Sequence, residues 1–163
     1  MIDYDHLDTP IGRLLLAADD DGLRYVEFDR PGQGQRITPA WRRSRGPLAD
    51  AIAQLEAYFA GELRAFDLPL AAVGTAFRKS VWRELERIPY GETISYGELA
   101  RRIGDPAASR AVGAANGANP LPIIVPCHRV IGANGTLTGF GGGLPVKQWL
   151  LAHERRHAPF VLS

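Results

Sequence analysis

The sequence predicts an α+β fold, in which a small domain of β-strands and one helix precedes a mostly helical domain. In the first 30 residues, short apolar stretches alternate with turn signals, a pattern typical of antiparallel strands. After residue 75, apolar residues recur at helical spacing behind residues that cap helices. Residues 71–74 separate the two patterns. We therefore expect two domains, over residues 1–74 and 75–163.

The amino-terminal half begins with apolar stretches at 14–16 and 23–28, bounded by turn residues, which predict a β-meander. Residues 30–46 are rich in Pro, Gly, Gln and Arg and lack periodicity, so we expect a surface loop whose arginines are solvated. Pro47 then opens a helix that Gly61 ends. Its apolar face consists of Leu48, Ala51, Ile52, Leu55, Tyr58 and Phe59. Residues 66–70 predict a last strand.

Three short helices are expected next. Thr75 caps a helix that ends at residues 89–91, and the spacing of Ser95 and Glu98 is that of a capping box opening a helix over 96–103. Asp105, followed by a proline, predicts the N-cap of a third helix that ends near residue 116. Two short helices joined by a glycine-containing turn indicate a helix-turn-helix.

The remaining chain combines an apolar run, a glycine-rich loop and a final helix. Residues 121–125 predict a buried strand leading to Cys127. The loop over 131–143 lacks the lysine and the spacing of a phosphate-cradling loop, which argues against nucleotide hydrolysis. Pro145 opens the last helix, which carries basic residues in its last turn.

Composition and charge narrow the functional class. Residues 1–75 carry a net charge of −4 and residues 76–163 a net charge of +5. A basic half suits a polyanionic partner, although solvated arginine-rich helix faces explain this excess equally well. The chain has no apolar run near the roughly 20 residues of a membrane span. Its start is acidic, unlike a signal peptide, and its single cysteine cannot form an internal disulfide. We expect a cytoplasmic protein without a membrane partner.

The single cysteine, Cys127, is followed directly by His128. A thiolate is the useful nucleophile, and a nearby imidazole helps to form it. A lone cysteine next to apolar residues is as often a small buried hydrophobe, so spacing alone leaves both interpretations open.

Residues 107–118 also allow two interpretations, because eight of the twelve are Ala or Gly. Such a helix fits a DNA minor groove, but it also fits tight packing against another helix.

Six ordered motifs resemble one family, the O6-alkylguanine-DNA alkyltransferases. They are Ile-Ser-Tyr-Gly at 94–97, Arg-Ala-Val-Gly at 110–113, Asn-Pro at 119–120, Pro-Cys-His-Arg-Val at 126–130, Gly-Gly-Gly at 141–143 and Trp-Leu-Leu-Ala-His-Glu at 149–154. Residues 1–74 resemble the variable amino-terminal domain of that family only in length and pattern. The resemblance implies a ribonuclease-H-like support domain, followed by a winged-helix-like domain that binds DNA.

The resemblance also implies a function. The family repairs DNA by moving an alkyl group from O6 of guanine in duplex DNA to a cysteine, once per molecule and without a cofactor. Cys127 matches the acceptor and His128 the residue that deprotonates it through a water. Glu154 matches the carboxylate that orients the imidazole. Whether O4-alkylthymine is repaired, and whether a monomer binds DNA cooperatively, stays open.

Further positions match the residues of the family that bind DNA and substrate. Tyr96 matches the donor to the guanine ring that also crowds the 3′ phosphate, and Asn119 the hinge beside the active-site loop. Val130, Phe140 and Gly141 match the lining of the base pocket. Arg110, with its neighbour Ala111, matches the arginine finger of the minor-groove helix.

Two pocket positions depart from many relatives of the family. Phe140 stands where many relatives carry tyrosine, so any role of that hydroxyl is absent. Gly141 stands where some relatives carry serine, which suggests tolerance of bulkier adducts. Some relatives also hold zinc in the amino-terminal domain, but residues 1–74 contain no cysteine and only His6. No metal is therefore expected.

Three other functions compete with alkyl transfer. A cysteine hydrolase would need an oxyanion hole and turnover, and it would not need a minor-groove helix with Arg110. A regulator of the helix-turn-helix class would be expected to carry polar residues that read bases. A module that binds damage without chemistry is the main alternative, although such relatives lack the cysteine that this chain has.

Overall fold

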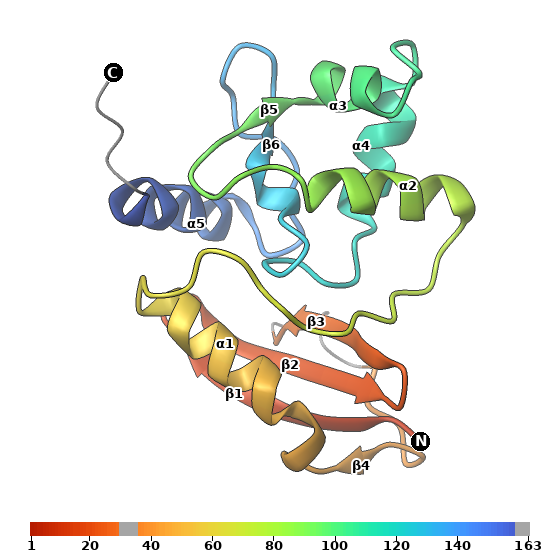
Figure 1. Ribbon diagram of the computed structural model, residues 1–163, viewed down its shortest axis with the longest axis vertical. Coiled ribbons are helices and arrows are strands. Elements are labelled where there is room, and N and C mark those ends of the chain that lie inside the picture. The colour runs from red at the N-terminus through yellow and green to blue at the C-terminus, as the bar shows by residue number, and fades with distance from the viewer. Residues whose placement is uncertain (30–35, 159–163) are drawn as a thin grey trace. The chain divides into compact units, whose positions relative to one another are not determined.

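The computed structural model describes residues 1–29 and 36–158 (Figure 1). Its residues fall into two compact units. The first contains Met1–Gly74 together with Pro120–Ile124, and the second contains Thr75–Asn119 and Val125–Ser163. The first unit is built on a β-sheet and the second mainly on helices, so the predicted α+β class is confirmed. The exact domain boundaries stay a prediction.

The sheet of the first unit has the strand order β3-β2-β1-β4. Its strands are β1 (Asp3–Thr9), β2 (Gly12–Asp19), β3 (Gly22–Phe28) and β4 (Arg42–Arg43). The first three pair antiparallel, which confirms the meander, whereas β4 pairs parallel with β1. Gly22 is required at the second turn, because its φ is +140° and a Cβ there would lie 2.5 Å from the Pro69 carbonyl oxygen.

The core of the first unit lies between β2 and the helix that covers the sheet. A short 3₁₀ turn, η1 (Gly46–Leu48), leads into α1 (Ala49–Phe59), as the position of Pro47 predicts. The face of α1 buries Ala51, Ile52, Leu55 and Tyr58. Residues 14–17 of β2 are fully buried on both faces of the strand. Burial of this apolar area is the main favourable contribution to folding of the unit.

Two predictions for the first unit are wrong. Residues 66–70 form no strand, and only Leu70 makes an isolated bridge, to Leu23. Pro69 has no N–H to donate, and the Gln54 side chain on α1 binds both the N–H and the carbonyl of Asp67 at 2.9 Å. Pairing with β3 is limited to the bonds from the Leu23 N–H to the Pro69 carbonyl at 2.9 Å and from the Ala71 N–H to the Leu23 carbonyl at 2.8 Å.

The segment 30–46 is also not wholly a surface loop, because it contains β4. The expectation for residues 30–35 lies outside the described residues. Around β4 the arginines form ion pairs with two nearly buried aspartates of β1, at 2.6 Å between Arg42 and Asp3 and at 3.3 Å from both Arg43 and Arg45 to Asp5. These pairs hold β4 against the edge of the sheet, so the arginine cluster is not simply solvated.

The second unit packs its helices around the segment that contains Cys127. Its elements are α2 (Ala76–Leu85), β5 (Ile94–Ser95), α3 (Tyr96–Arg102), α4 (Ser109–Gly117), η2 (Cys127–Arg129), β6 (Val130–Ile131) and α5 (Leu144–His157). Two of the three predicted caps are present, because Thr75 accepts from the Arg78 N–H and Ser95 accepts from the Glu98 N–H. The helix α2 ends at Leu85, one turn earlier than predicted. None of the described helices is long and apolar enough to cross a membrane.

Two further predictions are wrong in this part of the chain. Asp105 does not cap the third helix; its carbonyl accepts from the Ala108 N–H in a turn, and α4 begins at Ser109 with no side-chain cap. Residues 121–125 form buried turns rather than a strand. Prolines at 120, 122 and 126 remove the N–H donors that strand pairing requires. The backbone of Ile123 turns through a positive φ of 76°.

Candidate active site

Cys127 opens the short helix η2 directly after the turns at residues 121–126. Its side chain is buried, and the residue is only 5% exposed. Burial raises the pKa of the Cys127 thiol from 9.0 to about 11. A hydrogen bond from Asn119 and the positive charge of Lys147 act in the opposite direction. Burial therefore favours the thiol, while Asn119 and Lys147 make the buried thiolate less unfavourable.

The residue after the cysteine, His128, forms a buried pair with Glu154 of α5. Its Nε2 lies 2.6 Å from Glu154 Oε2, and both side chains are almost completely buried. Burial lowers the pKa of His128 more than Glu154 raises it, so the imidazole is neutral near pH 7. Burial alone would raise the pKa of Glu154, but hydrogen bonds and charges from His128 and Arg129 hold it well below its usual range. A neutral imidazole that donates Nε2–H to a carboxylate keeps Nδ1 as a base.

Arg129 completes this buried network. Its Nε donates to Glu154 Oε1 at 2.8 Å and its Nη2 to Oε2 at 3.1 Å, while Nη1 donates to the Ile88 carbonyl at 2.6 Å. The Gly91 N–H also donates to Glu154 Oε1, at 3.2 Å. The carboxylate is therefore fixed from both sides, which fixes the imidazole of His128 in turn.

Lys147 on α5 is fully buried and touches two segments around the cysteine. Its Nζ donates to the Val130 carbonyl at 2.7 Å and to the Thr138 carbonyl at 2.9 Å. Burial lowers the pKa of Lys147, whereas the negative charge of the Cys127 thiolate raises it. A buried ammonium is stable only when it is hydrogen-bonded and compensated, so Lys147 and the thiolate stabilise each other.

Tyr96 stands at the start of α3 and lies against α4. A Cβ added at Gly113 would be 3.9 Å from ring carbons of Tyr96. The Tyr96 hydroxyl accepts a hydrogen bond from Thr138 Oγ1 at 3.1 Å and so retains its own proton for donation. Because Lys147 binds the Thr138 carbonyl, Tyr96 is connected to the surroundings of Cys127.

Asn119 follows α4, and its Nδ2 donates to the Val125 carbonyl at 2.8 Å. This bond joins the end of α4 to the segment before Cys127. Arg110 and Ala111 are exposed on the same helix. Phe140 is half-buried and Gly141 exposed, in a turn closed by a bond from the Gly143 N–H to the Phe140 carbonyl at 2.9 Å. The roles of these residues in DNA and base binding stay predictions.

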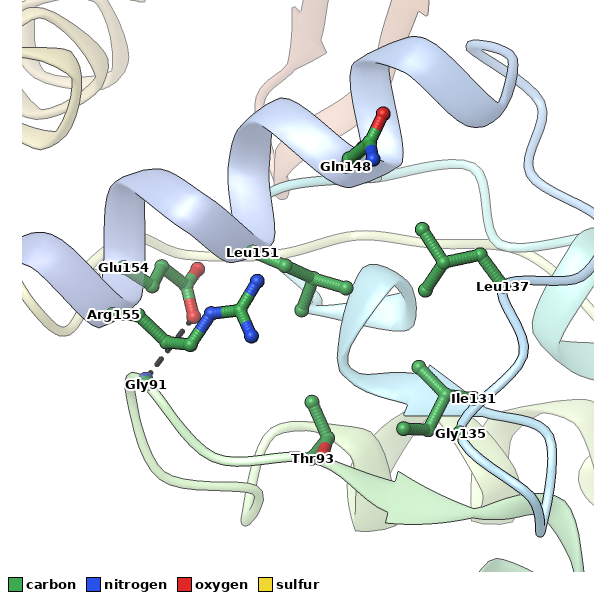
Figure 2. A pocket seen from close by; sticks show the side chains of 9 residues that line it. All are labelled: Gly91, Thr93, Ile131, Gly135, Leu137, Gln148, Leu151, Glu154 and Arg155. Atoms are coloured by element: carbon green, nitrogen blue, oxygen red, sulfur yellow. Dashed lines mark hydrogen bonds between the residues drawn. The ribbon is translucent and has the colours of Figure 1, made fainter.

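A cavity of about 280 Å³ borders Glu154 (Figure 2). It is lined by Gly91, Thr93, Ile131, Gly135, Leu137, Gln148, Leu151, Glu154 and Arg155. Only Glu154 of these belongs to the predicted site, and Cys127 and Val130 are not among them. This cavity therefore differs from the predicted base pocket. Within residues 1–29 and 36–158, no three His, Cys, Asp or Glu side chains gather as metal ligands.

Known proteins similar to this chain match both of its halves. Residues 76–156 match the family model for the DNA-binding domain of 6-O-methylguanine DNA methyltransferase, and residues 2–72 match the model for its ribonuclease-like domain. A methylated-DNA–protein-cysteine methyltransferase of Methanosarcina acetivorans is 54% identical over 93% of this chain and 97% of its own. One from Mycolicibacterium paratuberculosis is 54% identical over all of this chain and 98% of its own. The chain belongs to the 6-O-methylguanine DNA methyltransferase family.

A solved structure of the family agrees with this assignment. The structure of Mycobacterium tuberculosis OGT in complex with DNA superposes with a TM-score of 0.88 at 50% identity, and covers 96% of this chain and 95% of that one. The predicted resemblance is therefore confirmed along the whole chain, including residues 2–72, where the motifs had given no specific support.

Several residues that lie around Cys127 in this protein were not predicted from the sequence. Lys147, Arg129 and Thr138 all make contacts in the site, yet none was assigned a role. A signal existed for Lys147, because it shares the spacing of Leu150, Leu151 and Glu154 along one helix face. A lysine on the apolar face of a helix indicates a buried charge. No comparable signal marks Thr138, whose contacts come from the fold of the loop.

Proposed function

We propose that this protein repairs alkylated DNA by direct reversal, moving an alkyl group from O6 of guanine to Cys127. One observation carries the proposal: in a chain of this family, Cys127 is followed by an imidazole that burial keeps neutral and that Glu154, itself held by Arg129, fixes in place. That arrangement supplies a base beside a nucleophile and requires neither metal nor cofactor. Duplex DNA containing O6-alkylguanine is the partner.

The reaction is a displacement at the alkyl carbon. The thiol proton passes through a water to Nδ1 of His128, and the thiolate attacks the carbon. The carbon–oxygen bond breaks, its electron pair stays on guanine, and a carbon–sulfur bond forms. The Tyr96 hydroxyl donates toward the guanine ring and limits the charge on the leaving group. Overall, the thiol proton replaces the alkyl group on guanine.

The product limits each molecule to one reaction. A thioether offers water no carbonyl to attack, so Cys127 stays alkylated. The protein is therefore a stoichiometric methyltransferase. This separates it from a cysteine hydrolase, whose thioester intermediate turns over.

DNA binding is assigned to the helix-turn-helix of α3 and α4. The small residues of α4 allow close approach to the minor groove, and the exposed Arg110 enters the base stack where the damaged nucleotide has left it. Tyr96 is the first residue of α3, and Asn119 follows the end of α4. We propose that a single molecule binds in the cytoplasm, and that the flipped base enters beside Val130, Phe140 and Gly141.

The test is the intact mass of the protein after incubation with a duplex that carries one O6-methylguanine. The wild type should gain one methyl group per molecule and then stop, whereas Cys127→Ser should gain none. Binding selective for damaged DNA without a gain in mass would instead identify a module that only senses damage. Repeated release of methanol would identify a hydrolase.

A further inference from the structure

Two asparagines stand one helical turn apart at the end of α4, and only Asn119 has an assigned role. Asn116 is 3% exposed, and its Nδ2 donates to the Cys127 carbonyl at 3.4 Å. This bond fixes the orientation of the amide, because exchanging the two atoms would bring two oxygens together. Asn116 Oδ1 is buried and has no hydrogen-bond partner among residues 1–29 and 36–158.

His128 presents a second buried atom of the same kind. Its Nε2 is engaged by Glu154, whereas Nδ1 has no partner within the described part of the chain. Since the imidazole is neutral and donates from Nε2, Nδ1 is an acceptor, as is Asn116 Oδ1. Leaving either buried acceptor unsatisfied would destabilise the folded protein.

Both acceptors adjoin the same peptide group. Asn116 binds the carbonyl of Cys127, and the nitrogen of that peptide belongs to His128. One buried water has two O–H groups, which can donate to the two acceptors. The same water has a lone pair that can accept a hydrogen bond from a third group. The Cys127 thiol, directly before His128 in the chain, is the donor that the proposed reaction supplies.

We propose that Asn116 is a positioning residue, which holds one water between its Oδ1, His128 Nδ1 and the Cys127 thiol. The water accepts the thiol proton and passes one of its own protons to Nδ1, while its other O–H stays bonded to Asn116. The inference rests on the proposed function, in which His128 deprotonates Cys127 through a water. Because Asn116 lies on α4, the helix to which we assign DNA binding also sets the geometry of proton transfer from Cys127 to His128.

A high-resolution crystal structure of the full chain gives the direct test. A water within about 3.2 Å of both Asn116 Oδ1 and His128 Nδ1 is expected in the wild type. In Asn116→Leu that water should be displaced or bound to His128 alone. A wild-type structure in which no single water contacts both atoms would overturn the proposal.

Kinetics supplies a readout that a purely structural role would not change. With free O6-benzylguanine, which needs no DNA binding, Asn116→Leu should react at least about tenfold more slowly near pH 7. The difference in rate between the variant and the wild type should shrink at high pH, because hydroxide then deprotonates Cys127 without the bound water and His128. Asn116→Ser retains an acceptor oxygen and should recover part of the rate. An equal deficit at every pH would contradict the role in proton transfer.

Val112→Ala is the matched control, because Val112 is a fully buried residue of the same helix without polar contacts. It should lower the stability of the protein and leave the shape of the pH profile unchanged. The two proposals fail separately. A wild type that gains no methyl group refutes the proposed function, whereas a reactive wild type matched by Asn116→Leu at every pH refutes the role of Asn116.

Discussion

At the scale of single residues, Lys147 is a charge that the fold buries fully beside Cys127. In Lys147→Met the ammonium disappears, while the new side chain has similar length. We expect the pKa of the Cys127 thiol to rise further and alkyl transfer near pH 7 to slow by about tenfold or more, because the thiolate loses its cation. Single-turnover transfer rates against pH measure both effects.

The chain provides an exact counterpart for this experiment, since Lys79 is its only other lysine and is exposed on α2. Lys79→Met should react with free O6-benzylguanine at the wild-type rate. If Lys147→Met also does so at every pH, its charge plays no part in forming the thiolate.

The buried pair of Glu154 and Arg129 should contribute to the stability of the fold as well as to the position of His128. In Glu154→Gln the buried guanidinium loses its counter-charge, and breaking such a pair costs about 3–5 kcal/mol. Urea denaturation of the variant should show this loss in the free energy of unfolding. Glu98→Gln, which breaks exposed pairs with Arg101 and Arg102, should cost less than about 1 kcal/mol. Similar losses in the two variants would contradict the importance of burial.

These residues also show what the sequence could and could not predict. Cys127, His128 and Glu154 were found because they match family motifs, and the structure places His128 and Glu154 in contact. Lys147 was missed because its partners are the carbonyls of Val130 and Thr138, and backbone acceptors leave no trace in the sequence. The same reason hid Asn116, whose bond is to the Cys127 carbonyl.

At the scale of elements, local signals predicted helices well and short strands poorly. Caps such as Ser95 act within one turn of the chain and can be read from neighbouring residues. The buried run at 121–125 looked like a strand because apolarity reports burial and not backbone geometry. Its prolines were the stronger signal and should have decided against a strand.

The element that most directly tests DNA binding is α4, through its exposed Ala111. Ala111→Glu places a bulky negative charge on the surface assigned to the minor groove. Affinity for duplex DNA should fall by at least about tenfold, because phosphates repel the carboxylate and the close approach is blocked. Fluorescence anisotropy with a labelled duplex measures this, and stability should change by less than about 0.5 kcal/mol.

The control for this variant is Ala49→Glu, which adds the same charge at an exposed position of α1 in the other unit. Its effect on DNA affinity should be small. Ala111→Glu should still react normally with free O6-benzylguanine. Unchanged DNA affinity of Ala111→Glu would mean that another surface binds DNA.

At the scale of the whole molecule, the buried network makes global stability depend on pH with a definite sign. The native state keeps His128 neutral, whereas the unfolded chain protonates this histidine below its ordinary pKa of 6.5. The native state keeps Glu154 ionised, whereas the unfolded chain protonates it below 4.5. In both cases the unfolded state binds more protons as the pH falls, so acid destabilises the fold.

The free energy of unfolding should therefore decrease below about pH 6.5, with a slope approaching about 1.4 kcal/mol per pH unit for one proton. Below about pH 4.5 the slope should steepen as Glu154 adds its contribution. Urea titrations between pH 4 and 8 measure this curve. His128→Gln should flatten it between pH 4.5 and 6.5, because this variant lacks the group that takes up the proton on unfolding. If the curve of His128→Gln runs parallel to that of the wild type through this window, His128 is not held neutral in the native state, and its Nδ1 could not serve as the base that the reaction needs.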